Sequence, residues 1–295
     1  MTTITANAKA SGVFTIGGDL TVNRLGFGAM RITGEGIWGE PKNADEARRL
    51  LRRAVELGIN FIDTADSYGP EVSERLIAEA LHPYPKDLVI ATKGGLTRQG
   101  PAKWLPVGRP EYLTQCVEMS LRRLRLERID LYQLHRIDEK VPVEESLGAL
   151  VELQKAGKIR HIGLSEVSPD EIERAGKTAK IVSVQNRYNI SDRQHEKTLD
   201  YCENRQLGFI PWFPVAAGKL VAPGGPLESL AKRHNVSVAQ LSLAWLLHRS
   251  PVMLPIPGTS SVKHLEENVA AADLKLNEQE WKEVEETAKA AGQSH

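Results

Sequence analysis

The chain has 295 residues, enough for one large barrel or two modest domains. Hydrophobic residues make up 41% and charged residues 26%, as in an ordinary soluble globular protein. Lys plus Arg and Asp plus Glu each total 38, so the formal net charge is zero. This balance argues against a protein that binds nucleic acid or a membrane surface through an overall basic field.

The two cysteines, Cys116 and Cys202, lie far apart in the sequence. So few thiols disfavour a structural disulfide and, still more, a metal site, and we interpret them as buried or half-buried thiols in helices. The N-terminal MTTITANAKA lacks the basic region and apolar run of a signal peptide, and no apolar stretch is long enough to cross a bilayer. We therefore expect a cytoplasmic protein with a flexible tail over residues 1–10.

Taken in chain order, the first elements are two short apolar runs, Val13–Ile16 and Leu20–Val22, around Gly17-Gly18-Asp19. Paired glycines followed by Asp favour a tight hairpin turn. Beyond Gly26, helix-period segments alternate with short apolar runs. The expected helices are Ala44–Leu57, Val72–Leu81, Glu111–Leu124, Val143–Ala156, Glu171–Gly176, His195–Arg205 and Val238–Leu247. The expected strands are Val22–Gly26, Ile59–Ile62, Leu88–Ala91, Ile129–Tyr132, Ile159–Leu164, Ile181–Val184, Gly208–Ile210 and Val252–Leu254.

About eight β/α units of crossover length predict a parallel barrel. An open doubly wound sheet gives similar local patterns, but its G-x-G-x-x-G fingerprint is missing. The run Gly26-Phe27-Gly28-Ala29-Met30-Arg31 has only the first two glycines, and no helix starts there. We predict a single (β/α)8 TIM barrel over residues 11–295, with an N-terminal β-hairpin and a C-terminal helix.

Polar residues at the C-terminal ends of barrel strands point into the active-site mouth. Four such residues, Asp63, Tyr68, Lys93 and His135, follow three successive predicted strands. Hydride attack on a carbonyl builds negative charge on oxygen, which must be stabilised and protonated. A phenol with pKa ~10 is a weak acid unless a nearby ammonium favours its anion, and an Asp would hold that ammonium in place. The His is suited to orient the carbonyl, and the set does not form a compact metal cluster.

Each of these four residues alone has a simpler interpretation. Asp63 is suited to cap a loop, Lys93 to lie on the surface, Tyr68 to pack at the rim, and His135 to be a structural histidine. Their occurrence together at neighbouring strand ends favours catalysis.

Several motifs resemble the aldo-keto reductase family. They are DTADSYG at residues 63–69, ATKGG at 91–95, LYQLH at 131–135, GKIRHIGLSE at 157–166, VQNRYN at 184–189 and IPGTSSVKHLEEN at 256–268. The resemblance runs from about Leu25 to Asn268. It implies a β/α barrel closed at its base by an N-terminal hairpin, which reduces aldehydes and ketones with NADPH. It also implies Asp63, Tyr68, Lys93 and His135 as the catalytic tetrad, with Tyr68 as the proton donor.

The resemblance also assigns cofactor contacts. Ser165 and Gln185 would bind the nicotinamide carboxamide, and Trp212 would stack on the ring, although Trp212 also suits a core position. A loop-to-helix start after the eighth strand is a natural phosphate site. The expected cofactor residues are Gly28, Ala29, Met30, Asp63, Ser165, Gln185, Trp212, Pro214, Val215, Ala217, Gly218, Lys219, Gly258, Thr259, Ser260, Lys263, His264, Glu267 and Asn268.

Two positions depart from the family pattern. Glu166 stands where the family usually has Asn, and a carboxylate cannot donate hydrogen bonds as an amide does. His264 replaces the family's common Arg near the adenosine 2′-phosphate, which leaves Lys263 as the expected cation. NADPH remains the expected cofactor.

The long Gly- and Pro-rich segment 94–109 is expected to form a wall or lid of the pocket. Trp38 and Trp104 on such loops suggest a flat, partly apolar substrate, so we expect both, with Tyr68 and His135, to bind it; anchoring of the loops is the alternative. The stretches 28–41, 84–95 and 102–106 resemble the bacterial branch of the family that contains pyridoxal reductases. Pyridoxal or another aromatic aldehyde would suit the pocket. Two other hypotheses remain: a redox-sensing regulatory barrel that binds NADPH, and a barrel hydrolase or lyase.

Overall fold

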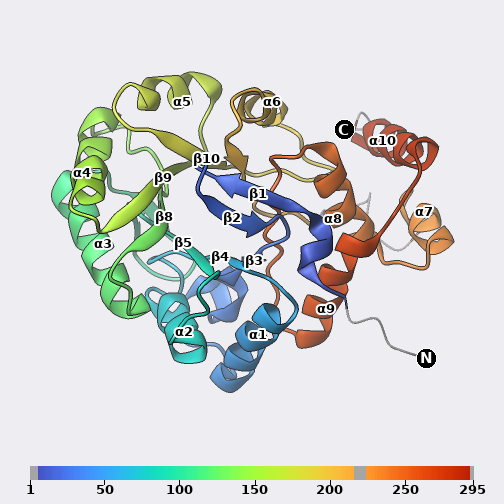
Figure 1. Cartoon of the computed structure of the whole chain (residues 1–295), viewed down its shortest axis with the longest axis horizontal. Helices are drawn as coiled ribbons and strands as arrows, with labels where there is room; N and C mark the ends of the chain where they lie inside the picture. Colours follow the sequence, from blue (N-terminus) through green and yellow to red (C-terminus); the bar gives the residue numbers. More distant parts are fainter. Residues whose placement is uncertain (1–5, 216–223, 293–295) are drawn as a thin grey trace.

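The computed structural model describes residues 6–215 and 224–292, with side chains as far as residue 290. Seven parallel strands curl into a barrel in the order β11, β10, β9, β8, β5, β4, β3. Their bounds are β3 Phe27–Gly28, β4 Phe61–Asp63, β5 Val89–Gly94, β8 Ile129–Leu134, β9 Ile159–Ser165, β10 Ile181–Gln185 and β11 Gly208–Phe209. Helices surround the strands (Figure 1): α1 Ala44–Glu56, α2 Val72–Leu81, α3 Pro110–Leu124, α4 Val143–Lys155, α5 Pro169–Gly176, α6 Glu196–Asn204 and α8 Val238–Arg249. The predicted (β/α)8 barrel is confirmed.

An extended segment, residues 252–257, takes the eighth position in the barrel. The backbone N–H groups of Phe209 and Gly26 donate to the carbonyl oxygens of Val252 and Pro255, each at 2.9 Å, so the segment joins the first and last strands. Two prolines, at positions 255 and 257, have no N–H to donate, which prevents a regular ladder. The predicted eighth strand is therefore reduced to a single β-bridge.

The predicted hairpin covers one end of the barrel (Figure 1). It consists of β1 Val13–Ile16 and antiparallel β2 Leu20–Asn23, and the two glycines of its turn have φ angles of +66° and +92°. Because Val22 pairs with Phe14 in this hairpin, the prediction that Val22–Gly26 is the first barrel strand is wrong. The first barrel strand is β3, five residues further on.

The hairpin also fills the base of the barrel. Its apolar side chains pack with inward-facing residues of the strands in one buried cluster: Ile16, Leu20, Val22, Phe61, Val89, Ala91, Leu131, Val182, Ile210, Leu254 and Ile256. The opposite end of the barrel, where the parallel strands terminate, is left for a site.

Further helices lie at the two ends of the chain. Residues Ala8–Ser11 form a 3-10 helix (η1), which begins within the expected tail of residues 1–10. Ala8 is buried in it and donates its N–H to Leu57 O at 2.8 Å. The expected C-terminal helix is α10, Glu278–Gly292, which is held to α8 by a 2.9 Å bond from the Trp245 indole to Glu285. The remaining helices are η2 Ala29–Ile32, η3 Glu35–Ile37, α7 Glu228–Arg233, α9 Val262–Ala270 and η4 Ala271–Asp273.

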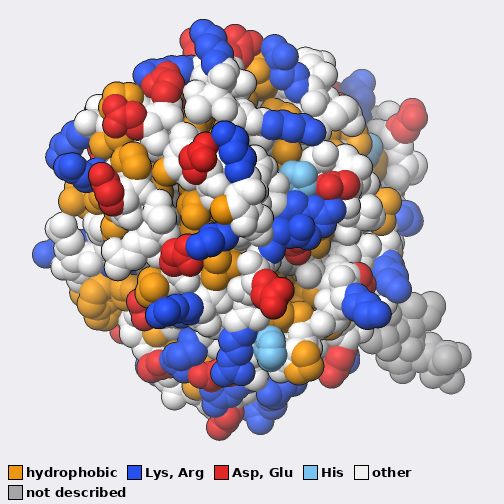
Figure 2. Space-filling model, turned by 60° about the vertical axis from the view of Figure 1, so that its left-hand side comes forward, with side chains coloured by type: hydrophobic (Ala, Val, Ile, Leu, Met, Phe, Trp, Pro, Cys, Tyr) orange, Lys and Arg blue, Asp and Glu red, His pale blue; other side chains and the backbone are white. Residues whose placement is uncertain are grey.

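Charge is distributed evenly over the face shown in Figure 2, where Lys and Arg side chains lie among Asp and Glu side chains. Both cysteines are buried and free, on α3 and α6, as the sequence predicts. Among the helices that the structure describes, none has the length and apolarity needed to span a membrane.

Candidate active site

Three predicted catalytic residues meet at the C-terminal ends of β4 and β5. Lys93 Nζ donates to Asp63 Oδ2 at 2.6 Å and to the Thr64 carbonyl oxygen at 2.8 Å, and lies 3.3 Å from the hydroxyl of Tyr68. Lys93 is fully buried and Asp63 is 2% exposed. β4 and β5 are neighbours in the sheet, so the two strands bring the acid and the ammonium side by side.

Two glutamines hold the other oxygen of Asp63. The amide groups of Gln133, on β8, and Gln185, on β10, donate to Asp63 Oδ1 at 3.0 Å and 2.8 Å. Asp63 therefore accepts three side-chain hydrogen bonds, and both of its oxygens are satisfied although the side chain is buried. Gln133 was not selected from the sequence, although it lies on β8, two residues before His135.

The electrostatics of Tyr68 correct one expectation. Burial raises the pKa of Tyr68 above its usual value of 10, and this outweighs the lowering by the charge of Lys93. Burial alone would lower the pKa of Lys93, but Asp63 and Tyr68 together hold it above its usual value. Tyr68 is therefore a protonated phenol beside a charged ammonium. The charge of Lys93 does lower the pKa of Tyr68, as expected, but the effect of burial is larger and the pKa rises overall.

His135 completes the group from the end of β8. Its ring centroid lies 6.0 Å from that of Tyr68, and its Nδ1 is 3.3 Å from the hydroxyl oxygen of Ser67. Burial, and then the positive charges of Lys93 and Arg136, lower the pKa of His135 well below 6.5. The imidazole is neutral at pH 7. A hydrogen bond from Ser67 to Nδ1 would leave the proton on Nε2, free to donate to a substrate.

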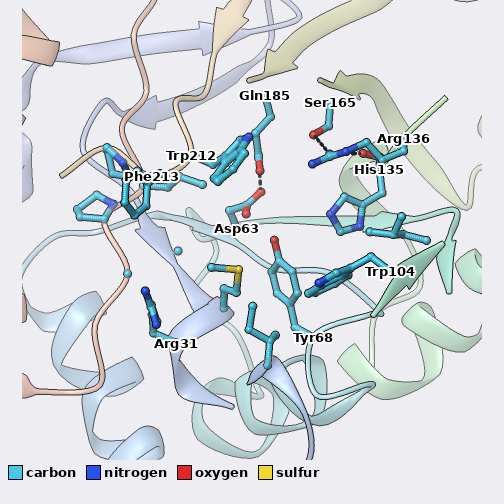
Figure 3. Close-up of a pocket in the computed structure, with 18 of the residues that line it drawn as sticks. Arg31, Asp63, Tyr68, Trp104, His135, Arg136, Ser165, Gln185, Trp212 and Phe213 are labelled. Atoms are coloured by element: carbon cyan, nitrogen blue, oxygen red, sulfur yellow. Dashed lines mark hydrogen bonds between the residues drawn. The ribbon is translucent and has the colours of Figure 1, made fainter. Parts of the chain in front are cut away.

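A cavity of about 610 Å³ opens in front of these residues (Figure 3). Its lining is Gly28, Met30, Arg31, Ile37, Asp63, Tyr68, Leu96, Trp104, Pro106, His135, Arg136, Ser165, Gln185, Trp212, Phe213, Pro214, Val215, Ile256, Pro257 and Gly258. Aromatic rings stand on two sides of Tyr68 and Asp63 in Figure 3, Trp104 on one and Trp212 with Phe213 on the other.

One wall is a small antiparallel hairpin, β6 Leu96–Arg98 with β7 Trp104–Pro106, where a loop was expected. Trp104 packs edge-on to Tyr68, with ring centroids 6.4 Å apart. The guanidinium of Arg98 lies 3.6 Å from the Trp104 ring and 5.5 Å from the Trp38 ring. Trp38 is 38% exposed and stacks behind Arg98 instead of lining the cavity.

Glu166 follows β9 and contacts Trp212 rather than the cavity. Its Oε1 accepts bonds from the indole N–H of Trp212 at 2.6 Å and from the backbone N–H of Arg187 at 2.7 Å. Its backbone has a left-handed φ of +56°, which turns the side chain away from the direction of Ser165. The departure from the family's Asn thus has a structural role that the sequence did not reveal.

Other predicted cofactor residues lie at the end of the cavity away from His135. Gly28 faces Ile256, and a Cβ there would come within 2.6 Å of the Ile256 carbonyl oxygen, so only glycine fits. Gly258 lies beside Arg31, a cavity residue that the sequence analysis did not select. Lys263 is 82% exposed and 3.9 Å from Glu267, one turn along α9.

The remaining predicted residues do not line the cavity. Ala29 is fully buried, and His264 and Ser260 are exposed. Thr259 accepts the Ser261 N–H at 3.1 Å, in the turn just before α9. Asn268 is buried on α9. Ala217, Gly218 and Lys219 lie outside the described residues.

Comparisons with known proteins identify the family of the chain. The profile of the Aldo/keto reductase family matches residues 24–289. An uncharacterised oxidoreductase from Schizosaccharomyces pombe is 54% identical over 92% of this chain and 89% of its own length. Pyridoxine 4-dehydrogenase from Escherichia coli is 43% identical, over 92% of this chain and 96% of its own. A solved aldo-keto reductase from Klebsiella pneumoniae in complex with NADPH superposes with a TM-score of 0.78 at 25% identity, covering 93% of this chain and 94% of that one. The chain belongs to the aldo/keto reductase family.

Proposed function

We propose that the protein reduces an aldehyde or ketone to the alcohol with NADPH, and that Tyr68 supplies the proton. The observation that carries the proposal is the buried contact of Lys93 Nζ with both Tyr68 OH and Asp63, at the wall of a cavity with room for a ring. NADPH supplies a hydride to the carbonyl carbon when it is bound.

The residues of the chain handle the charge that appears on the carbonyl oxygen. Tyr68 donates its proton to that oxygen, and the ammonium of Lys93 stabilises the phenolate that is left. Neutral His135, held by Ser67, donates a second hydrogen bond and fixes the direction of the carbonyl. Asp63 keeps Lys93 charged in a buried position, where an unpaired ammonium would lose its proton.

The cofactor is proposed to lie along the cavity from the tetrad to Gly258. Trp212 offers an indole face to the nicotinamide, and Ser165 and Gln185 offer hydrogen-bonding groups to its carboxamide. Arg31 is the cation suited to the pyrophosphate, because it lines the cavity beside Gly258. Lys263 is the cation proposed for the 2′-phosphate at the start of α9. The NADPH complex of the Klebsiella pneumoniae relative supports this choice of cofactor.

An aromatic aldehyde is the proposed substrate. Trp104, Leu96 and Pro106 give the substrate side of the cavity an apolar wall that suits a flat ring. The 43% identity to a pyridoxine 4-dehydrogenase supports pyridoxal as one candidate.

The proposal is tested by following NADPH oxidation by the purified protein with pyridoxal, benzaldehyde and short aliphatic aldehydes. Aldehyde-dependent oxidation with formation of the alcohol is the expected result. NADPH binding without turnover of any aldehyde would favour a regulatory barrel, and absence of NADPH binding would favour a hydrolase or lyase.

A further inference from the structure

Arg136 carries a positive charge at the substrate end of the cavity. It directly follows His135 at the end of β8, and Figure 3 shows its guanidinium reaching towards Ser165 above the His135 ring. The charge of Arg136 contributes to the lowering of the pKa of His135. The charge of Arg136 is therefore felt at His135, the residue proposed to hold the carbonyl of the substrate.

Among the residues that the structure describes, one nitrogen of this guanidinium forms hydrogen bonds within the protein. Arg136 Nη1 donates to the His135 carbonyl oxygen at 2.6 Å and to Ser165 Oγ at 2.9 Å. A guanidinium has five N–H donors, so Nε and Nη2 retain three. In the part of the chain that the structure describes, these three have no protein acceptor.

The charge of Arg136 also has no ion-pair partner among the described residues. Among residues 6–215 and 224–292, no carboxylate forms an ion pair with Arg136; Glu166 acts on it electrostatically but is bonded to Trp212. Burial lowers the pKa of Arg136, as expected for a cation that has lost water. Positive charge held without a counter-ion beside a binding cavity is suited to an anionic ligand, and the planar fork favours oxygen acceptors.

We propose that Arg136 is a specificity-determining residue that selects aromatic aldehydes with an anionic oxygen ortho to the formyl group. The inference rests on the carbonyl reduction proposed above. With the carbonyl oxygen on Tyr68 and His135, an ortho oxygen is the substituent nearest to the residue that follows His135. The walls of Trp104 and Leu96 require that the anion be carried on a flat ring. The phenolate keeps its charge throughout the reaction.

The test uses three aldehydes near pH 9, where a phenol acidified by a formyl group is ionised: salicylaldehyde, 4-hydroxybenzaldehyde and 2-methoxybenzaldehyde. The ortho and para phenolates are both conjugated to the formyl group, so they differ mainly in where the charge lies. The methoxy compound has the ortho shape without the charge. We expect the wild type to reduce salicylaldehyde with a kcat/KM at least tenfold above that of either control.

Two variants test whether Arg136 causes the preference for salicylaldehyde. Arg136→Gln should lower kcat/KM for salicylaldehyde about ten- to a hundredfold, the range of a charge-assisted hydrogen bond. The same substitution should change kcat/KM for 2-methoxybenzaldehyde by less than about threefold. It should also change the NADPH dissociation constant by less than about threefold. Arg136→Lys, which keeps the charge but not the fork, should recover part of the preference, and thermal unfolding checks that both variants fold.

Equal losses for all three aldehydes, or a loss of NADPH affinity that accounts for the change, would overturn the inference. If the wild type reduces no aldehyde, the proposed function fails separately. The anion subsite is then tested alone by calorimetric titration of the NADP⁺ complex with salicylaldehyde and with its para isomer. Preferential binding of the ortho isomer that Arg136→Gln abolishes would support the subsite, and equal binding would reject it.

Discussion

Glu166 Oε1 holds the indole N–H of Trp212 at 2.6 Å, and the same oxygen accepts the backbone N–H of Arg187 at 2.7 Å. The bond fixes the plane of the ring that we propose to stack on the nicotinamide. Glu166 thus acts on the cofactor through Trp212, as a positioning residue.

Removal of the Glu166 acceptor should weaken cofactor binding. Glu166→Ala leaves the indole N–H unpaired, which costs about 1–2 kcal/mol and should raise the NADPH dissociation constant about tenfold. Glu166→Gln keeps an oxygen acceptor and should change it by less than about threefold. Tryptophan fluorescence quenching measures both. Identical effects of the two substitutions would show that the charge, and not the hydrogen bond, matters.

Tyr68→Phe removes the proposed proton donor and keeps the ring. Turnover of a reactive aldehyde should fall on the order of a hundredfold or more, while NADPH affinity stays within about threefold. Tyr84→Phe is the matched control, because its hydroxyl bonds the Leu124 carbonyl oxygen at 2.6 Å, away from the cavity. Near-normal reduction by Tyr68→Phe would mean that another group donates the proton.

The pH dependence of reduction follows from the raised pKa of Tyr68. The donor works only while protonated, so a pKa above 10 keeps it active through neutral pH, and the rate should fall only in strongly alkaline solution. In Lys93→Met the lowering charge is gone, so any residual activity should be smaller and should fall at a still higher pH. Steady-state profiles with a poor substrate, for which chemistry limits the rate, give the comparison. A wild-type rate that falls between pH 7 and 9 would contradict the assignment.

Arg31 and Lys263 should affect the two cofactors differently. Arg31→Ala should weaken NADPH and NADH alike, since both carry the pyrophosphate. Lys263→Ala should weaken NADPH alone, and less, because Lys263 is 82% exposed and solvent screens its charge. Parallel titrations with both cofactors at low and high salt decide the matter. If Lys263→Ala weakened both equally, its assignment to the 2′-phosphate would be withdrawn.

A carboxylate outside the tetrad predicts a pH effect on stability. Burial, and then the charge of Glu74, raise the pKa of Asp66 to about 7. Its Oδ1 is buried and has no hydrogen-bond partner in the described part of the chain. The folded protein therefore holds this proton more tightly than the unfolded chain, and stability is lost as pH rises from about 4 towards 7. One pKa unit is about 1.4 kcal/mol, so the loss is at most about 4 kcal/mol. Asp66→Asn should be more stable than the wild type at pH 8 and not at pH 4, by urea unfolding. An equal difference at both would exclude this carboxyl as the cause.

Much of the fold was predictable because local signals agree with the barrel. Asn43, which directly precedes the expected helix Ala44–Leu57, caps α1 by accepting the Glu46 N–H at 3.0 Å. The errors have local causes. The prolines of segment 252–257 lack the backbone N–H donors that a regular β-ladder requires. The strands of the β6–β7 hairpin have three residues each, too few to show the alternation of apolar and polar residues typical of a strand.

The four candidate catalytic residues could be predicted to lie close together because strand ends carry them, and the same rule extended by one residue would have found Arg136. Glu166 could not have been assigned in this way. Its contact with Trp212 joins residues 46 positions apart, and the left-handed turn that directs it leaves no mark in the sequence.

Arg98 has a consequence for engineering. Its guanidinium donates to the carbonyl oxygens of Gly36 and Ile37 after β3 and of Ser67 after β4, while it stacks on Trp104 of β7. Three loops from different parts of the chain thus share one cation. Exchange of the β6–β7 hairpin alone for one without this arginine would remove the Arg98 hydrogen bonds from three carbonyl oxygens, among them that of Ser67, whose hydroxyl lies 3.3 Å from the His135 ring. To transfer the substrate specificity of a relative to this protein, the loops after β3 and β4 and the β6–β7 hairpin would therefore have to be exchanged together.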